Sequence, residues 1–174
     1  VNGQLNAVVW KRFDDARAEA TAVDQKRKAG GALGPLAGVP VTLKECIDLK
    51  GAPSTFGLPS RKNILAAADE THARRLRDAG AVVLGKTNVA QMLLSFESSN
   101  PLFGRVNNPW NLNRTSGGSS GGEGVIIAAR GSTLGIGTDL GGSVRIPAAF
   151  NGIASIKPTV GRCPDVGRFS YPLG

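Results

Sequence analysis

The apolar positions near the start of the chain repeat at helical spacing. They recur every three or four residues at Val9, Phe13, Ala16, Ala20 and Val23. Charged side chains occupy most of the positions between them, and Gly30-Gly31 ends the pattern. The sequence therefore predicts one amphipathic helix over residues 7–28.

The next patterns alternate between strand and helix. Residues 39–46 are apolar and β-branched, which predicts a strand with Lys44 near its end. Residues 51–60 are rich in glycine, proline and serine, which predicts a loop. The acidic pair Asp69-Glu70 then opens a helix that Gly80 ends, and residues 81–84 form an apolar strand. Such a helix-then-strand unit is typical of an α/β protein.

Glycine-rich loops and short apolar segments alternate in the C-terminal part, where residues 125–129 predict a helix and residues 153–156 a strand. The 174 residues, 41% of them hydrophobic, are enough to bury the core of one domain. The chain starts at Val1 without a methionine and stops in a turn-rich stretch. We therefore expect residues 1–174 to be one partial domain, truncated at both ends, with no second domain.

The net charge of +8 raises the question of a nucleic-acid partner. The basic residues are diffuse, however, with their main groups at Lys11-Arg12, Lys26-Arg27-Lys28, Arg61-Lys62 and Arg74-Arg75. The first two groups share a predicted helix with four acidic residues, and aromatic residues are only 5% of the chain. We expect no nucleic-acid partner.

The cysteines and the hydropathy of the sequence indicate where in the cell the protein is expected. No apolar run approaches the roughly 18 residues of a membrane span, and no signal peptide is visible. Cys46 and Cys163 show no clustering that would suit a disulfide framework or a zinc site. An intracellular, cytoplasmic location is expected, without metal or cofactor, and membrane association stays open.

The first glycine-rich stretch surrounds Ser119 in Gly117-Gly118-Ser119-Ser120-Gly121-Gly122. It lacks the lysine of a phosphate-binding loop. It formally fits the nucleophile elbow of α/β-hydrolases, in which a histidine follows the serine along the chain. The only histidine, His72, precedes Ser119 and lies in a predicted surface helix. The elbow alternative therefore needs a histidine from outside these residues.

The second glycine-rich stretch, residues 135–147, has Leu140 where a dinucleotide-binding motif needs its third glycine. Two glycines, Gly141 and Gly142, instead precede Ser143. Their backbone N–H groups can turn toward one point in front of that serine, which is how an oxyanion hole is built. Taken alone, either stretch also fits a flexible Gly/Ser loop.

Three segments together resemble the amidase signature family. They are GVPVTLKE at residues 38–45, GGSSGG at residues 117–122 and GTDLGGSVRIP at residues 137–147. Residues 94–104 and 108–110 resemble its fatty acid amide hydrolase and acetamidase-like branch. The resemblance implies an α/β fold with a large mixed β-sheet covered by helices on both faces, of which only the N-terminal part is present. It also implies a serine hydrolase that cleaves carboxamides.

The resemblance implies a Ser-Ser-Lys triad. Ser143 corresponds to the acylated nucleophile, Ser119 to the bridging serine after a cis Gly118-Ser119 peptide bond, and Lys44 to the base. A serine hydroxyl is a weak nucleophile until a neighbour takes its proton. A lysine acts as that base only when it is neutral, and burial among apolar neighbours favours the neutral form.

Further residues receive roles from the same resemblance. The oxyanion donors are expected on the backbone N–H groups of Leu140, Gly141, Gly142 and Ser143. Ser120, Thr138, Asp139 and Arg145 are expected to support the site, with Asp139 and Arg145 tying down the loop of the nucleophile. Leu93 corresponds to a substrate-contacting position, although it fits a core residue equally well.

Three functions follow from these expectations. The first is a stand-alone amidase for fatty or small aliphatic amides, which Glu123 and residues 95–104 favour. The second is the amidase subunit of a tRNA-dependent amidotransferase, and the third is a non-catalytic fragment. The expected partner is a small-molecule amide substrate, and a homodimer is compatible with the sequence.

Overall fold

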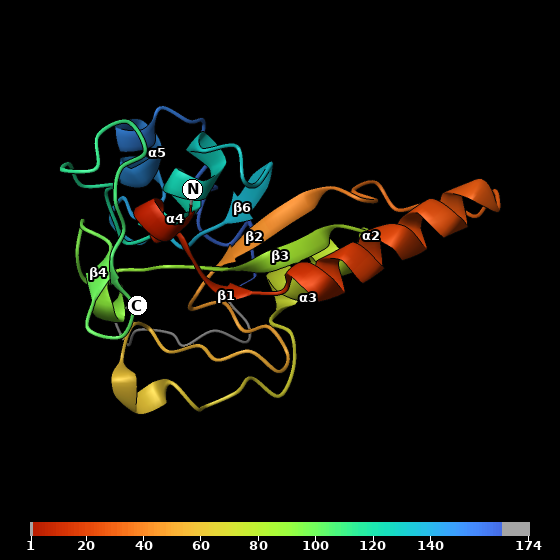
Figure 1. Cartoon of the computed structure of the whole chain (residues 1–174), viewed down its shortest axis with the longest axis horizontal. Coiled ribbons are helices and arrows are strands. Elements are labelled where there is room, and N and C mark those ends of the chain that lie inside the picture. Colours follow the sequence, from red (N-terminus) through yellow and green to blue (C-terminus); the bar gives the residue numbers. More distant parts are fainter. Residues whose placement is uncertain (1, 165–174) are drawn as a thin grey trace.

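The computed structural model describes residues 2–164, which form a four-stranded mixed sheet with the strand order β1-β3-β2-β6 (Figure 1). The strands are β1 (Val8–Lys11), β2 (Pro40–Lys44), β3 (Val82–Thr87) and β6 (Leu134–Ile136). β2 runs parallel to β3 and β6, whereas β1 is antiparallel to β3. Two short strands, β4 (Ser99–Asn100) and β5 (Gly104–Arg105), pair separately.

Helices lie against both faces of this sheet. The helices are α1 (Asn2–Leu5), α2 (Phe13–Lys28), α3 (Thr71–Asp78), α4 (Gly121–Ala128) and α5 (Arg145–Asn151), of which α5 packs against α4. The 3-10 turns are η1 (Pro59–Arg61) and η2 (Gln91–Leu93). Ala73 of α3 packs in one core cluster with Val41 and Leu43 of β2. α4 contacts β2 and β6 from the other side, where its Glu123 bonds to Thr42. The α/β fold with helices on both faces is confirmed.

Alternation along β2 separates an apolar face from a polar one. Val41 and Leu43 point into the core cluster under α3, so Thr42 and Lys44 point to the opposite face. Each residue of β2 pairs with one of β3, and Leu43 lies beside Lys86 while Lys44 lies beside Thr87. The end of β2 therefore delivers Lys44 to the α4 side of the sheet.

The prediction of one helix over residues 7–28 is wrong in its first third. Residues 8–11 form β1 and pair with β3, and α2 begins only at Phe13. Val8, Val9 and Trp10 are residues that favour strands, and the free edge of β3 offers them backbone partners. Tertiary pairing thus overrides a helical spacing of apolar residues.

The remaining element predictions have mixed outcomes. The strands at residues 39–46 and 81–84 are confirmed, and the second extends to Thr87. The helix at residues 125–129 is confirmed but begins four residues earlier, at Gly121. The strand at residues 153–156 is wrong, because these residues pair with no strand among residues 2–164 and Ile156 is 85% exposed.

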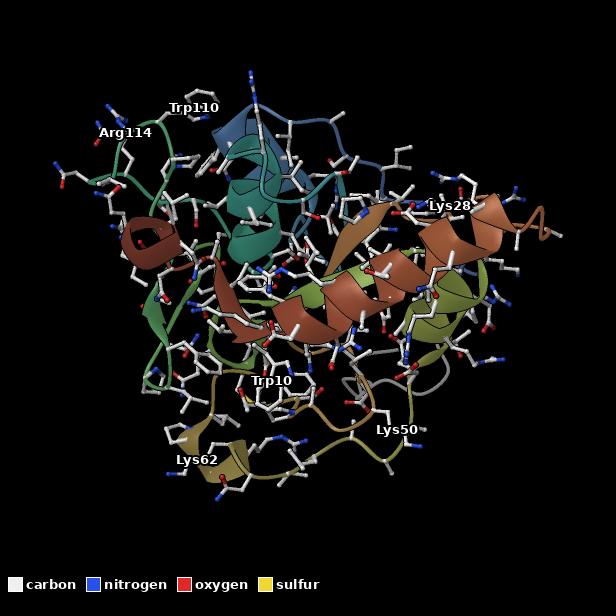
Figure 2. The ribbon with its side chains drawn as sticks, turned by 45° about the vertical axis from the view of Figure 1, so that its right-hand side comes forward. Trp10, Lys28, Lys50, Lys62, Trp110 and Arg114 are labelled. Atoms are coloured by element: carbon white, nitrogen blue, oxygen red, sulfur yellow. The ribbon has the colours of Figure 1, made fainter. Side chains whose placement is uncertain are left out.

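The basic side chains are spread over separate elements. Figure 2 shows Lys28 at the end of α2, Lys50 and Lys62 on the loops after β2, and Arg114 on a distant loop. This placement agrees with the diffuse charge expected from the sequence. Within residues 2–164, no helix is long and apolar enough to cross a membrane.

Candidate active site

Lys44 is a fully buried lysine at the C-terminal end of β2. Its Nζ donates a hydrogen bond to Ser119 Oγ at 2.7 Å and another to Thr138 Oγ1 at 2.8 Å. Ser119 precedes α4, and Thr138 follows β6. The lysine thus joins three segments that lie far apart in the sequence, and two of its contacts are hydroxyls rather than carboxylates.

Ser119 lies in a tightly packed turn before α4 and is 1% exposed. The Gly118-Ser119 peptide bond is cis, as the family resemblance led us to expect. A Cβ atom on Gly118 would lie 2.6 Å from the carbonyl oxygen of Ser95, so no larger residue fits there. The glycines of this stretch therefore allow close packing around Ser119 rather than a flexible loop.

Ser143 lies between β6 and α5 and is 8% exposed. Its carbonyl oxygen accepts a hydrogen bond from the Ser120 N–H at 3.1 Å, which ties it to the residue after Ser119. Within residues 2–164, no hydrogen bond joins the side chains of Ser143 and Ser119. Catalytic hydrogen bonds are often long in the absence of substrate and tighten when it binds.

Asp139 organises the loop that carries Ser143. Its carboxylate accepts hydrogen bonds from the backbone N–H groups of Gly142, Val144 and Arg145 at 2.8, 3.0 and 3.3 Å. The Arg145 guanidinium adds two more, at 2.8 and 3.0 Å. Burial alone would raise the pKa of Asp139, but the bonds from Arg145 and the backbone outweigh it and hold the pKa well below its usual range. The expected link between Asp139 and Arg145 is thus present.

The backbone N–H groups in front of Ser143 are not all free. Those of Leu140, Gly141 and Ser143 have no acceptor among residues 2–164. The N–H of Gly142 donates to Asp139 Oδ1 at 2.8 Å, and its assignment as an oxyanion donor stays a prediction. Gly142 instead has a φ of 124°, which a residue with a side chain rarely adopts, and it allows the turn before Ser143.

Two other expected site residues differ in their placement. Ser120 Oγ donates to the Thr138 carbonyl oxygen at 3.4 Å and so lies beside the lysine site. Leu93 has a φ of 62° and packs against the hydrophobic core cluster beneath the sheet. The packing of Leu93 favours a core residue over a substrate contact.

The sequence did not single out Glu123 as part of the site. This carboxyl is buried in α4 and accepts hydrogen bonds from Thr42 Oγ1 at 2.6 Å and Thr87 Oγ1 at 2.8 Å. Burial raises the pKa of Glu123 to about 7, although the two threonines and the charge of Lys44 act in the opposite direction. The signal in the sequence was an acidic residue inside an otherwise apolar and glycine-rich helix.

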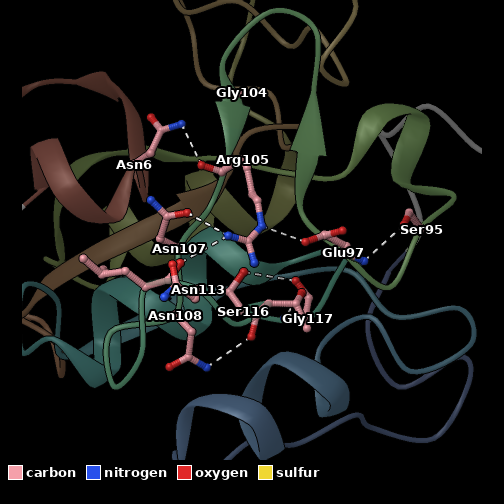
Figure 3. A network of polar contacts seen from close by, with 12 residues as sticks. Asn6, Ser95, Glu97, Gly104, Arg105, Asn107, Asn108, Asn113, Ser116 and Gly117 are labelled. Atoms are coloured by element: carbon pink, nitrogen blue, oxygen red, sulfur yellow. Dashed lines mark hydrogen bonds and ion pairs between the residues drawn. The ribbon is translucent and has the colours of Figure 1, made fainter.

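A polar network around Arg105 lies near Ser116 and Gly117, which precede Ser119 in the sequence (Figure 3). Arg105 Nε donates to Glu97 Oε1 at 2.8 Å, and its Nη1 donates to Asn107 Oδ1 at 3.2 Å. The neighbouring Ser98 donates its N–H to the Gly117 carbonyl oxygen and accepts the Gly121 N–H at 2.8 Å. The sequence did not predict these bonds, because the family resemblance of residues 94–104 gave no role to their individual side chains.

His72 belongs to a different part of the molecule. Its Nδ1 lies 2.6 Å from Oε1 of the buried Glu70, and its side chain is 20% exposed, so His72 lies on a surface helix as expected but has a buried partner. It is carried by α3, which covers the apolar face of the sheet, whereas Lys44 lies on the other face. Within residues 2–164, no group of three His, Cys, Asp or Glu side chains could hold a metal ion.

The structure thus brings a buried lysine into contact with a serine, and the residue after that serine bonds to the backbone of Ser143. The family model described as Amidase matches residues 1–174. The chain therefore belongs to the amidase family.

Individual relatives agree with this assignment. Fatty-acid amide hydrolase 2 of Homo sapiens is 44% identical over 181 residues, which cover 100% of this chain and 34% of that protein. A glutamyl-tRNA(Gln) amidotransferase subunit of Acidothermus cellulolyticus is 44% identical over 171 residues, which cover 98% of this chain and 34% of that subunit. The chain spans about a third of the length of these relatives.

A solved structure confirms the fold. A bacterial aryl acylamidase of the amidase signature family matches with a TM-score of 0.82 and 38% sequence identity. The match covers 85% of this chain and 31% of that one.

Proposed function

We propose that the protein to which this chain belongs is a serine hydrolase that cleaves carboxamides, with Ser143 as nucleophile, Ser119 as bridging residue and Lys44 as base. The observation that carries the proposal is the 2.7 Å hydrogen bond between Lys44 Nζ and Ser119 Oγ in a site where both residues are buried. Family membership supports the reaction class.

The first chemical step moves two protons. Ser143 Oγ attacks the amide carbonyl carbon and passes its proton to Ser119 Oγ, which passes its own to the neutral amine of Lys44. The free N–H groups of Leu140, Gly141 and Ser143 support an oxyanion role for this loop. Removing one such donor typically costs about 10²–10³-fold in kcat.

The second step expels the amine. Lys44 returns a proton through Ser119 to the leaving nitrogen as the carbon–nitrogen bond breaks, which leaves an acyl group on Ser143. Water, deprotonated by the same relay, then hydrolyses that ester and releases the acid. Fatty or small aliphatic amides are the proposed substrates, because the relatives include fatty-acid amide hydrolases.

A fluorophosphonate probe tests the assignment directly. It should modify Ser143 in the intact protein, and mass spectrometry of the digested adduct should locate it there. An adduct on Ser119 would contradict the proposal and favour the nucleophile-elbow alternative. A panel of fatty, small aliphatic and aryl amides then identifies the substrate class.

A second candidate function is the amidase subunit of a tRNA-dependent amidotransferase. It is supported by the 44% identity to the Acidothermus cellulolyticus protein, which equals the identity to the human hydrolase. Glutamine hydrolysis that depends on added partner subunits would favour this candidate. Hydrolysis of simple amides by the purified protein alone would favour the first. Absence of any labelled serine would favour a non-catalytic protein.

A further inference from the structure

The buried carboxyl of Glu123 has no part in the relay proposed above, although it lies beside it. Glu123 is the fourth residue after Ser119, in the first turn of α4. Its two carboxyl oxygens each accept a threonine hydroxyl, one from β2 and one from β3. A carboxyl so deeply buried is costly unless hydrogen bonds or a nearby charge compensate for it.

Glu123 contacts three neighbouring strands, namely β2, β3 and β6. Thr42 lies two residues before Lys44 on β2, and Thr87 is the direct neighbour of Lys44 on β3. The third strand, β6, approaches through Gly135, where an added Cβ atom would overlap Glu123 Oε2. The helix that follows Ser119 is thereby fastened to the strand that ends at Lys44.

The charges around Glu123 are few. β2 supplies the Thr42 hydroxyl and Lys44, and β3 supplies the Thr87 hydroxyl. Ser132 before β6 bonds to Thr42 and a backbone carbonyl, and α5 presents the uncharged Pro147 and Asn151 to α4 at Gly124. Lys44 is the charged group that acts on Glu123, and its cation favours the carboxylate. By the same interaction, a carboxylate at Glu123 favours the ammonium form of Lys44, which cannot accept a proton.

We propose that Glu123 is a positioning residue that fixes Lys44 against Ser119 and, through its own charge, sets how readily Lys44 becomes neutral. This inference rests on the proposed role of Lys44 as base. Since the carboxyl and the amine are both buried on the same side of the sheet, the charge of each influences the protonation of the other. The neutral acid permits a neutral lysine, whereas the carboxylate opposes it.

The test replaces Glu123 by glutamine in the intact protein. Glutamine keeps the size and an oxygen acceptor for a threonine but has no charge. The rate of Ser143 labelling by a fluorophosphonate is measured across pH 5–10 for the wild type, Glu123→Gln and the control Glu19→Gln, alongside amide hydrolysis and thermal unfolding. Glu19 lies on α2 and pairs with Arg12, away from the site.

The acid limb of the labelling profile should move to lower pH in Glu123→Gln, by about one unit, because removal of a buried negative charge makes Lys44 easier to deprotonate. Glu19→Gln should follow the wild type. A Glu123→Gln profile that coincides with the wild type, in a protein that remains folded, overturns the inference while leaving the proposed function intact. A shifted labelling profile without any amide hydrolysis supports the inference and contradicts the proposed substrate class.

Glu123→Leu separates position from charge. It removes both threonine contacts and should lower the thermal unfolding midpoint more than Glu123→Gln does. Equal midpoints for the two variants would contradict the bracing role, because the leucine cannot accept either hydrogen bond.

Discussion

Asp139 and Arg145 clasp the loop that carries Ser143, with Arg145 Nη2 2.8 Å from Asp139 Oδ1 and Arg145 Nε 3.0 Å from Asp139 Oδ2. The aspartate side chain is 3% exposed and the arginine side chain 54% exposed. The buried partner also holds three backbone N–H groups of the same loop. One carboxylate therefore determines where this loop lies.

Replacing Asp139 by asparagine should lower the catalytic efficiency while the protein remains folded. The amide group offers one acceptor oxygen to a carboxylate site that has five N–H donors, so the loop loses several charge-assisted bonds worth about 1.5–3 kcal/mol each. We expect kcat/KM to fall about 10²-fold, the effect of an ångström-scale misplacement of a reacting group. Steady-state kinetics measures this, with the exposed Asp14→Asn as control.

Acid should loosen the same loop. The pKa of Asp139 is lowered in the folded protein, so its stabilising contribution is complete above its ordinary value of about 3.9 and is lost as the pH falls toward the lowered value. The free energy of unfolding should therefore drop below about pH 4 more steeply in the wild type than in Asp139→Asn. Denaturant titrations at a series of pH values test this, and identical slopes would contradict it.

The identity of the base is tested by two substitutions. Lys44→Ala should slow acylation of Ser143 by about 10²–10⁴-fold, the range usual for loss of a general base. His72→Ala should leave acylation near its normal rate, because His72 bonds to Glu70 on the opposite face of the sheet. Single-turnover kinetics separates the two. The Ser-Ser-Lys mechanism fails if His72→Ala abolishes acylation while Lys44→Ala preserves it.

Gly135→Ala should destabilise the protein through its contact with Glu123. The added Cβ would overlap the carboxyl oxygen, and relieving such overlap in a packed core costs about 1–3 kcal/mol. Gly3→Ala is the matched control, since nothing lies within 4 Å of its added atom. Thermal unfolding should show a clear loss for the first variant and none for the second.

Chelation is expected to leave hydrolysis unchanged. The chemistry proposed here needs only serine, lysine and backbone amides, and the sequence has one histidine and two separated cysteines. Activity before and after treatment with a chelator, together with metal analysis of the purified protein, gives the answer. A stoichiometric metal whose removal abolishes activity would contradict this expectation.

The strands and the serine loops could be predicted because their signals are local. β-branched residues mark β2, and the glycines beside Ser119 and Ser143 mark the places where backbone must approach closely. The strand β1 could not be predicted, because its pairing with β3 depends on residues more than seventy positions away.

The supporting contacts of the site were predictable only in part. Asp139 and Arg145 lie within one motif, so the family resemblance was sufficient to connect them. The contacts of Glu123 with Thr42 and Thr87 join three elements that no short motif spans. The Gly142 N–H was assigned by its place in the motif, whereas its actual acceptor depends on how the Asp139 side chain folds back.

Two adjacent residues of β3, Lys86 and Thr87, disfavour a shifted pairing between β3 and β2. Lys86 stands beside Leu43 and sends its ammonium group to Pro53 and Ser54 under the apolar face, while Thr87 stands beside Lys44. If the pairing of β3 shifted by one residue, every side chain on β3 would move to the other face of the sheet. Lys86 would then lie on the same face as Lys44. Two buried amines would then compete for one set of hydroxyl partners, and Glu123 would lose Thr87. Only the native register places one lysine on each face of the sheet, so Lys86 and Thr87 favour the observed alignment of β3 with β2.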